Sequence, residues 1–132
     1  MKVSFDFDST LSRPCIQGYA QELISRGVDV WVTTSRNGDC KSFGMYIDND
    51  DLYTVTDALN IPRENIIFTC GVSKSAYIRN HNFIFHLDDD STELLEIRNA
   101  GIDTIGISCW NNSSWKKKCE RTIERKAKRP MA

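Results

Sequence analysis

The sequence predicts an α/β fold, a three-layer Rossmann-like α/β/α sandwich around a mostly parallel five-stranded sheet. Short runs of apolar and β-branched residues alternate with segments in which apolar residues recur every three or four positions. Glycine, proline or a helix-capping residue separates most of these segments. Strands that alternate with helices in this way form a parallel sheet that helices cover on both faces.

Each element has its own local signal. The apolar and β-branched runs predict strands over residues 3–7, 28–33, 65–69, 83–87 and 102–108. The helical periodicity predicts helices over residues 15–26, 49–59, 73–79, 91–99 and from 113 or 114 into the C-terminal segment. Gly27 and Gly101 are typical helix stops, and Ser73 and Ser91 are typical helix caps. Residues 37–47 are expected to form one long loop beside the sheet.

The composition is that of a globular protein with a single domain. The chain has 132 residues, of which 40% are hydrophobic and 27% are charged. Residues 1–112 are expected to form the core, and residues 113–132 a C-terminal helix and basic tail of the same domain. No apolar run approaches the roughly 20 residues that span a bilayer, and residues 1–6 lack the apolar segment of a signal peptide. We therefore expect a cytoplasmic protein without a membrane partner.

The charge distribution and the cysteine spacing further limit the possible partners and kinds of site. Residues 116–129 contain eight Lys or Arg and two Glu, although the whole chain has a net charge of −1. Such a segment is usually a solvated helix face, but it also makes nucleic acid a candidate partner. The five cysteines are scattered without Cys-x-x-Cys spacing, which disfavours a disulfide framework and a zinc site.

Polar residues end several of the predicted strands. Because the carboxyl ends of parallel strands share one edge of a sheet, these residues should lie together at the edge where α/β proteins bind ligands. Two of the groups are acidic, which suggests a shared cation, since close carboxylates repel each other. In chain order the groups are Asp6 and Asp8; Thr33, Thr34, Ser35 and Arg36; Lys74, which follows the third strand; and Asp88, Asp89 and Asp90.

This edge could carry out phosphoryl transfer. Mg²⁺ held by Asp6 and Asp88 would attract a phosphate that bare carboxylates repel. Asp6 could then attack phosphorus as a nucleophile, and Asp8 could act as general acid and base. Thr34 and Lys74 would supply a hydroxyl and a positive charge to the phosphoryl oxygens.

The chain resembles the haloacid dehalogenase (HAD) superfamily of phosphohydrolases. That family combines an Asp-x-Asp-x-Thr motif after a strand, a Ser or Thr closing a second strand, a Lys at a helix start and an acidic pair ending another strand. The matching residues, in the family's order, are Asp6, Asp8 and Thr10; Thr34; Lys74; and Asp88 and Asp89. One departure is Ser9, which stands where many members have glycine.

The resemblance implies a Mg²⁺-dependent phosphatase that forms an aspartyl phosphate. It implies that Asp6 is the nucleophile, that Asp8 is the acid and base, and that Thr34, Ser35 and Lys74 bind phosphate. Asp6, the Asp8 backbone carbonyl and Asp88 would bind Mg²⁺, with Asp89 as a second or outer ligand. The gaps between the motifs hold no cap domain, which in this family suggests either a large phosphorylated substrate or a site that a partner covers. A weaker similarity to the phosphatase domains of polynucleotide kinase-phosphatases points to a nucleotide or nucleic-acid end.

Several alternatives remain open from the sequence. Thr33 competes with Thr34 for the second motif, and Asp89 or Asp90 could take the place of Asp88. A response-regulator receiver also combines acids, Thr and Lys on a parallel sheet, but its phosphorylated Asp ends the third strand, where this chain has Phe68-Thr69-Cys70. The chain could also be a catalytically silent HAD-like domain that binds nucleic acid through its basic tail.

Overall fold

The structure contains one parallel sheet of five strands. The computed structural model describes residues 1–38, 40–42 and 45–128. The strands of the sheet are β1 (Lys2–Phe5), β2 (Asp29–Thr34), β5 (Ile66–Phe68), β6 (Phe83–Asp88) and β7 (Ile105–Ser108). They lie in the order β5-β2-β1-β6-β7, and all neighbouring pairs are parallel. The predicted fold class is confirmed.

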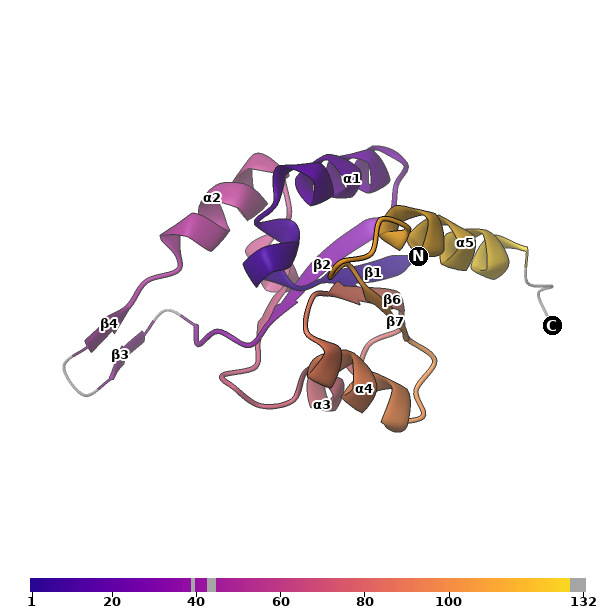
Figure 1. Ribbon diagram of the computed structural model, residues 1–132. Helices are drawn as coiled ribbons and strands as arrows, with labels where there is room; N and C mark the ends of the chain where they lie inside the picture. Colours follow the sequence, from indigo (N-terminus) through magenta and orange to yellow (C-terminus); the bar gives the residue numbers. More distant parts are fainter. Residues whose placement is uncertain (39, 43–44, 129–132) are drawn as a thin grey trace.

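Helices cover both faces of this sheet (Figure 1). One face carries α1 (Pro14–Ser25), α2 (Asp50–Ala58) and α5 (Trp115–Ala127). The other face carries α3 (Lys74–Ile78) and α4 (Ser91–Asn99). Among the described residues, no helix combines the length and apolar character that a bilayer crossing needs.

Strand alternation divides the core between the two faces. Val3 and Phe5 of β1 belong to the larger apolar cluster, whereas Ser4 between them faces the other side. This larger cluster includes Leu23 of α1 and Cys119 of α5. A smaller cluster of Ile78, Phe83 and Ile97 lies beneath α3 and α4.

The chain path places a ligand-binding position at the end of β1. From β1 the chain moves outward to β2 and β5, and it then returns to β6 on the other side of β1 before continuing to β7. The strand order therefore reverses between β1 and β6. In open α/β sheets, ligands bind outside the carboxyl ends of the strands at such a reversal.

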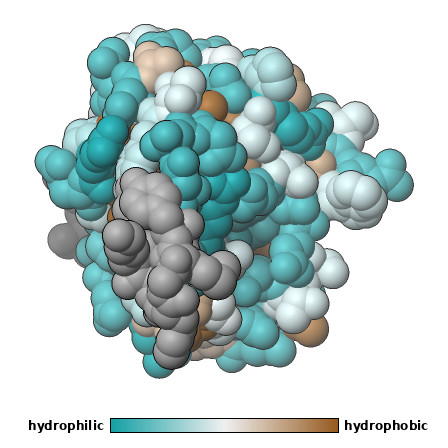
Figure 2. All heavy atoms as spheres, turned by 90° about the vertical axis from the view of Figure 1, so that its left-hand side faces the viewer, coloured by the Kyte–Doolittle hydropathy of each residue, from teal (hydrophilic) through white to brown (hydrophobic). Residues whose placement is uncertain are grey.

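The predicted loop over residues 37–47 is wrong, because it contains a hairpin. Strands β3 (Cys40–Ser42) and β4 (Met45–Ile47) pair in antiparallel fashion and project from the body of the molecule, on the side of the sheet's carboxyl ends (Figure 1). Strands of three residues are too short to show a period-two pattern in the sequence. Seen from that side, the surface is mostly hydrophilic (Figure 2).

Several boundaries and caps also differ from the prediction. The first strand ends at Phe5 rather than at residue 7, because the chain enters a helical turn over Phe7–Leu11. The last strand begins at Ile105 rather than at residue 102. The helix α4 is capped by Asp90, whose carboxylate accepts a hydrogen bond from the Thr92 amide, and not by Ser91.

Candidate active site

Strand geometry brings the acids of β1 and β6 together. Asp6 directly follows β1, and its amide donates to the Leu87 carbonyl of β6 at 2.8 Å. Asp88 is the last residue of β6. Since side chains two apart on a strand share a face, Asp6 follows Ser4 and Asp88 follows His86 on the face that α3 and α4 cover.

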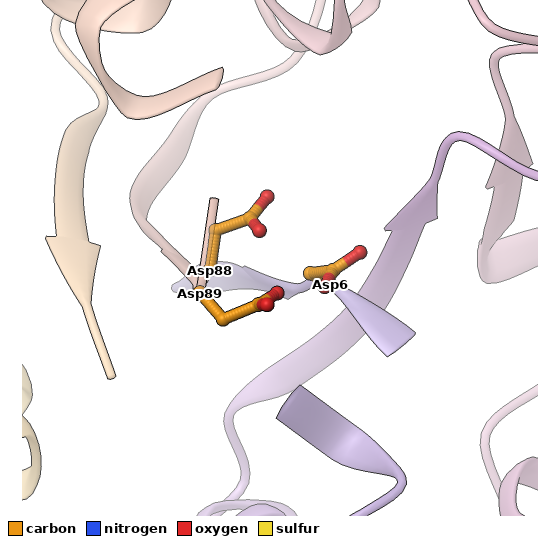
Figure 3. A group of neighbouring side chains, drawn as sticks. All are labelled: Asp6, Asp88 and Asp89. Atoms are coloured by element: carbon orange, nitrogen blue, oxygen red, sulfur yellow. The ribbon is translucent and has the colours of Figure 1, made fainter. Parts of the chain in front are cut away.

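Three carboxylates meet at this point (Figure 3). Asp6, Asp88 and Asp89 each offer one oxygen, and these oxygens all lie within 4.8 Å of one another. Asp6 and Asp88 are buried, at 4% and 0% exposure, whereas Asp89 is partly exposed. The group is therefore open to solvent on the Asp89 side.

Lys74 is the cation of this cluster. Its Nζ donates to Asp6 Oδ1 and to Asp88 Oδ2, both at 2.7 Å, and the side chain is buried. The start of α3 is held by α4, because the Lys74 amide donates to Glu93 at 2.9 Å and the Ser73 hydroxyl donates to Glu96. The helix pair thus fixes where this ammonium group lies.

Burial and charge shift the pKa values of the residues in the cluster in different directions. Burial and then the charge of Asp88 raise the pKa of Asp6 well above its usual range, although Lys74 opposes the shift. Burial would also raise the pKa of Asp88, but the hydrogen bond from His86 and the charge of Lys74 outweigh it and lower that pKa. Burial would lower the pKa of Lys74, but the two carboxylates outweigh it and raise that pKa. A proton taken up here therefore binds Asp6.

The donor set fits a hard divalent cation. All three ligand groups are carboxylates, which Mg²⁺ prefers over nitrogen or sulfur. Three carboxylates face one ammonium group, so the cluster carries more negative than positive charge, and burial followed by the charge of Asp88 raises the pKa of Asp6. Thr10 Oγ1 lies 3.2 Å from Asp6 Oδ2 and 3.4 Å from Asp89 Oδ1, and its single proton can serve one of them at a time.

Asp8 lies apart from the other acids. The Arg36 guanidinium donates to both Asp8 oxygens at 3.0 and 2.7 Å, and to both Asp51 oxygens at 2.7 and 2.8 Å. The guanidinium also lies over the Phe7 ring, 5.0 Å from its centroid. The sequence left the role of Arg36 open, and in the structure it pairs with these two acids.

The helical turn after Asp6 has an unusual backbone at Ser9. Its φ is 59°, in the left-handed region that glycine enters without cost. This conformation gives a physical reason why glycine would suit the position. A serine here carries backbone strain next to the acid cluster.

The threonines at the end of β2 have different partners. The Thr33 hydroxyl lies 2.8 Å from Ser4 Oγ inside the sheet. Thr34 Oγ1 accepts a hydrogen bond from the Arg36 amide at 3.3 Å, and Ser35 is exposed beyond the strand end. Thr33 and Thr34 are both fully buried, and Ser35 is the exposed residue at this edge.

The three consecutive acids at positions 88–90 also have different contacts. Asp88 and Asp89 join the carboxylate cluster, whereas Asp90 caps α4. The Asp90 amide donates to Asp88 Oδ1 at 3.0 Å. This arrangement places the acidic pair at Asp88 and Asp89.

The sequence predicts no role for His86, but in the structure its side chain contacts Asp88 of the cluster. His86 is fully buried, and its Nε2 lies 2.8 Å from Asp88 Oδ2. Burial lowers the pKa of His86, against the opposing effect of Asp88. The signal was present as spacing, because a polar residue in an otherwise apolar strand lies two positions before a predicted ligand.

A groove with an exposed tryptophan lies next to the cluster. Trp110 follows β7, is 70% exposed, and lines this groove together with Ser9, Arg13 and Asn111. Trp115 also lines the groove, but it packs against the core and contacts Tyr19.

No protein-family model matches the chain, and a search of curated proteins finds no significantly similar sequence.

Proposed function

We propose that this chain is a Mg²⁺-dependent phosphatase of the HAD type that cleaves a phosphate monoester through an aspartyl phosphate on Asp6. The observation that supports the proposal most is the cluster of Asp6, Asp88, Asp89 and Lys74 at the strand-order reversal. A nucleophile, a cation site and a fixed positive charge are the parts that phosphoryl transfer needs.

Asp6, Asp88 and Asp89 would hold the cation. Bound Mg²⁺ would supply the positive charge that lets a phosphate approach these carboxylates. Lys74 is placed to stabilise the negative charge on the phosphoryl oxygens, and Thr34 offers them a hydroxyl. Asp6 must be ionised to attack, so the raised pKa of Asp6 makes the nucleophile dependent on added positive charge.

The reaction has two balanced steps. An Asp6 oxygen bonds to phosphorus while the ester oxygen leaves and takes a proton from Asp8. Asp8 then takes a proton from water, whose oxygen displaces Asp6 and releases inorganic phosphate. Because Asp8 is paired with Arg36, the proposal includes rotation of the Asp8 side chain from Arg36 toward the substrate.

A nucleotide or a nucleic-acid end is the substrate class that we propose. The support is the groove of Ser9, Arg13 and Trp110 beside the cluster, which offers an aromatic face and a cation. Bases stack on exposed aromatic rings without sequence preference, and arginine contacts phosphate. Along the chain, the described residues between β2 and β5 form the hairpin β3–β4, the helix α2 and a short turn over Arg63–Asn65. A segment of this kind is not a cap domain, which suits an open site.

Phosphate release from p-nitrophenyl phosphate with and without Mg²⁺ tests the proposal. We expect release that EDTA abolishes and that Asp6→Asn reduces to background, because an amide cannot form the intermediate. Asp8→Asn should lower the rate about 10²–10⁴-fold, the usual share of general acid–base catalysis. A panel of mononucleotides and of 3′- and 5′-phosphorylated oligonucleotides would then identify the substrate.

The matched control is Asp103→Asn, an exposed acid at the opposite end of the sheet. This variant should keep full activity. Thermal unfolding of each variant shows that it is folded. A folded Asp6→Asn protein that releases phosphate at the rate of the unmodified chain would refute the proposal.

A second candidate is a catalytically silent domain that binds nucleic acid. One observation favours it: the helix α5 exposes several cations, and two of them line a groove near the amino ends of β6 and β7. The exposed basic residues of α5 are Lys116, Lys117, Lys118, Arg121, Arg125 and Lys126. The groove is lined by Arg79, Arg125 and Lys126.

A further inference from the structure

A chain of buried polar side chains runs through the sheet to the acid cluster. The Thr33 hydroxyl lies 2.8 Å from Ser4 Oγ, Ser4 Oγ lies 2.9 Å from His86 Nδ1, and His86 Nε2 lies 2.8 Å from Asp88 Oδ2. All four residues are 0% exposed. They come from three neighbouring strands, β2, β1 and β6.

Such a chain is costly unless every group in it has a partner. A buried polar group without a hydrogen bond loses its hydration without compensation. If packing were the only requirement, apolar residues could occupy the positions of Ser4 and His86, since the smaller apolar cluster lies on this face. The polar side chains of Ser4 and His86 therefore suggest that Asp88, the last member of this hydrogen-bonded row, needs a fixed partner.

The chemistry of Asp88 sets the direction of the hydrogen bonds. An ionised carboxylate only accepts, so His86 Nε2 carries the proton that points at Asp88. In the neutral ring, Nδ1 then accepts from the Ser4 hydroxyl, and Ser4 in turn accepts from Thr33. We assign this tautomer from the contacts.

The same contacts show how many acceptor positions on the Asp88 carboxylate remain free. Its Oδ2 accepts from both Lys74 and His86, which uses both lone pairs of that oxygen. Its Oδ1 accepts from the Asp90 amide. Among the described residues, one acceptor position on Oδ1 is left for a cation.

We propose that His86 is a positioning residue, which fixes the rotation of the Asp88 carboxylate so that Oδ1 faces the cation site, and that Ser4 holds the His86 ring in the required tautomer. This inference rests on the proposed function, because it takes Asp88 as a ligand of the cation. Groups that orient metal ligands typically change metal affinity or activity about 10–100-fold when they are replaced.

Direct cation binding tests the proposal without relying on turnover. Mn²⁺ binding to the substrate-free protein is measured by electron paramagnetic resonance, and the Mg²⁺ concentration for half-maximal phosphate release is measured alongside it. His86→Leu should weaken Mn²⁺ binding about 10–100-fold. His86→Gln, which keeps an N–H at about the reach of Nε2, should recover most of the loss.

Ser4→Ala provides a milder test in case His86→Leu does not fold. Without the Ser4 hydroxyl the ring can adopt the other tautomer, so Mn²⁺ binding should weaken in the same direction. The Mg²⁺ requirement of turnover should rise, while the KM for p-nitrophenyl phosphate at saturating Mg²⁺ stays unchanged. The control is His81→Leu, at the opposite end of the sheet, which should leave Mn²⁺ binding as it is.

The outcomes separate this inference from the proposed function. Folded His86→Leu or Ser4→Ala proteins with unchanged Mn²⁺ affinity would show a purely structural role and overturn it. A wild-type chain that does not bind Mn²⁺ would overturn it as well. A chain that binds Mn²⁺ with the predicted loss in the variants, but releases no phosphate, would support the positioning role and refute only the phosphatase.

Discussion

Arg36 joins two acids from different parts of the chain through one planar group. Its guanidinium donates two hydrogen bonds to Asp8, two residues after Asp6 in the chain, and two to Asp51 at the start of α2. Paired hydrogen bonds of this kind are stronger and more directional than single ones. Arg36 therefore links the turn that carries Asp8, the proposed general acid and base, to the segment that follows the hairpin β3–β4.

The titration of Asp51 reports on this connection. The hydrogen bonds from Arg36 lower the pKa of Asp51 from 3.8 to about 2. A carboxyl whose pKa is lower in the folded state stabilises the fold above the unfolded pKa. That contribution is lost as the pH falls from about 4 toward 2. We expect carboxyl carbon NMR to give a midpoint near the lower value for Asp51.

In Arg36→Gln the midpoint of Asp51 should rise toward 3.8, because the largest cause of the shift is removed. Lys117→Gln, which removes a cation from the exposed face of α5, should leave it where it is. An Asp51 midpoint that is the same in Arg36→Gln would contradict the assignment of this shift to Arg36.

The sequence was sufficient to predict the residues of the cluster but not all of its contacts. Asp6, Lys74 and Asp88 could be placed together because each follows a recognisable strand, and the carboxyl ends of parallel strands share an edge. The partners of His86 lie on β1 and β6, and the Arg36 pairs join residues 15 and 28 positions apart. Contacts of this kind depend on strand register and rotamers, which a single sequence does not encode in any local pattern.

At the scale of elements, the helices differ in how much they contribute to the core. Leu23 of α1 is fully buried in the larger apolar cluster, whereas Leu95 of α4 is 55% exposed. The periodicity of apolar residues predicted both helices, but it did not show how deep each leucine lies. Depth depends on the neighbours that the other elements supply.

These two leucines form a matched pair for measuring core packing. Leu23→Ala should lower the free energy of unfolding by about 2–5 kcal/mol, because it removes a buried side chain and leaves a cavity. Leu95→Ala should change it by no more than about 0.5 kcal/mol. Urea unfolding followed by circular dichroism measures both, and equal losses would contradict the packing described for α1 and α4.

Elements with short or weak patterns were the ones that the sequence misplaced. Strand β7 begins at Ile105, because the Thr104 hydroxyl bonds the Phe83 carbonyl and Ile102 packs against the smaller apolar cluster. The hairpin β3–β4 has strands of three residues each. At β7 the tertiary contacts of Thr104 and Ile102 outweigh the local propensity, whereas the hairpin strands are too short to show a period-two pattern.

For the molecule as a whole, charge is distributed unevenly, and this distribution bears on binding. The basic side chains of α5 lie on its exposed surface, while Cys119 and Ile123 hold the helix against the core. A cationic surface of this kind binds polyanions with an affinity that falls as salt rises. We therefore expect this helix to contact the backbone of a single-stranded oligonucleotide.

Combining Lys117→Glu, Lys118→Glu and Arg121→Glu should weaken that binding at low salt. It should also reduce the slope of log affinity against log salt by about 2, at about 0.7 for each lost phosphate contact. Fluorescence anisotropy measures both. The control Arg98→Glu, on the opposite face, should have little effect. Binding that is insensitive to salt, or unchanged in the triple variant, would exclude this role for α5.

The central place of β1 determines how well the acid cluster is protected. Each β1 residue pairs with β2, and the strand pairs with β6 on its other side, immediately before Asp6. Amides in such a strand exchange with solvent mainly through global unfolding, whereas terminal helices and hairpins open locally. Fraying of α5 or proteolytic cleavage within the hairpin would therefore leave Asp6 in place, because moving Asp6 requires β1 to separate from both β2 and β6.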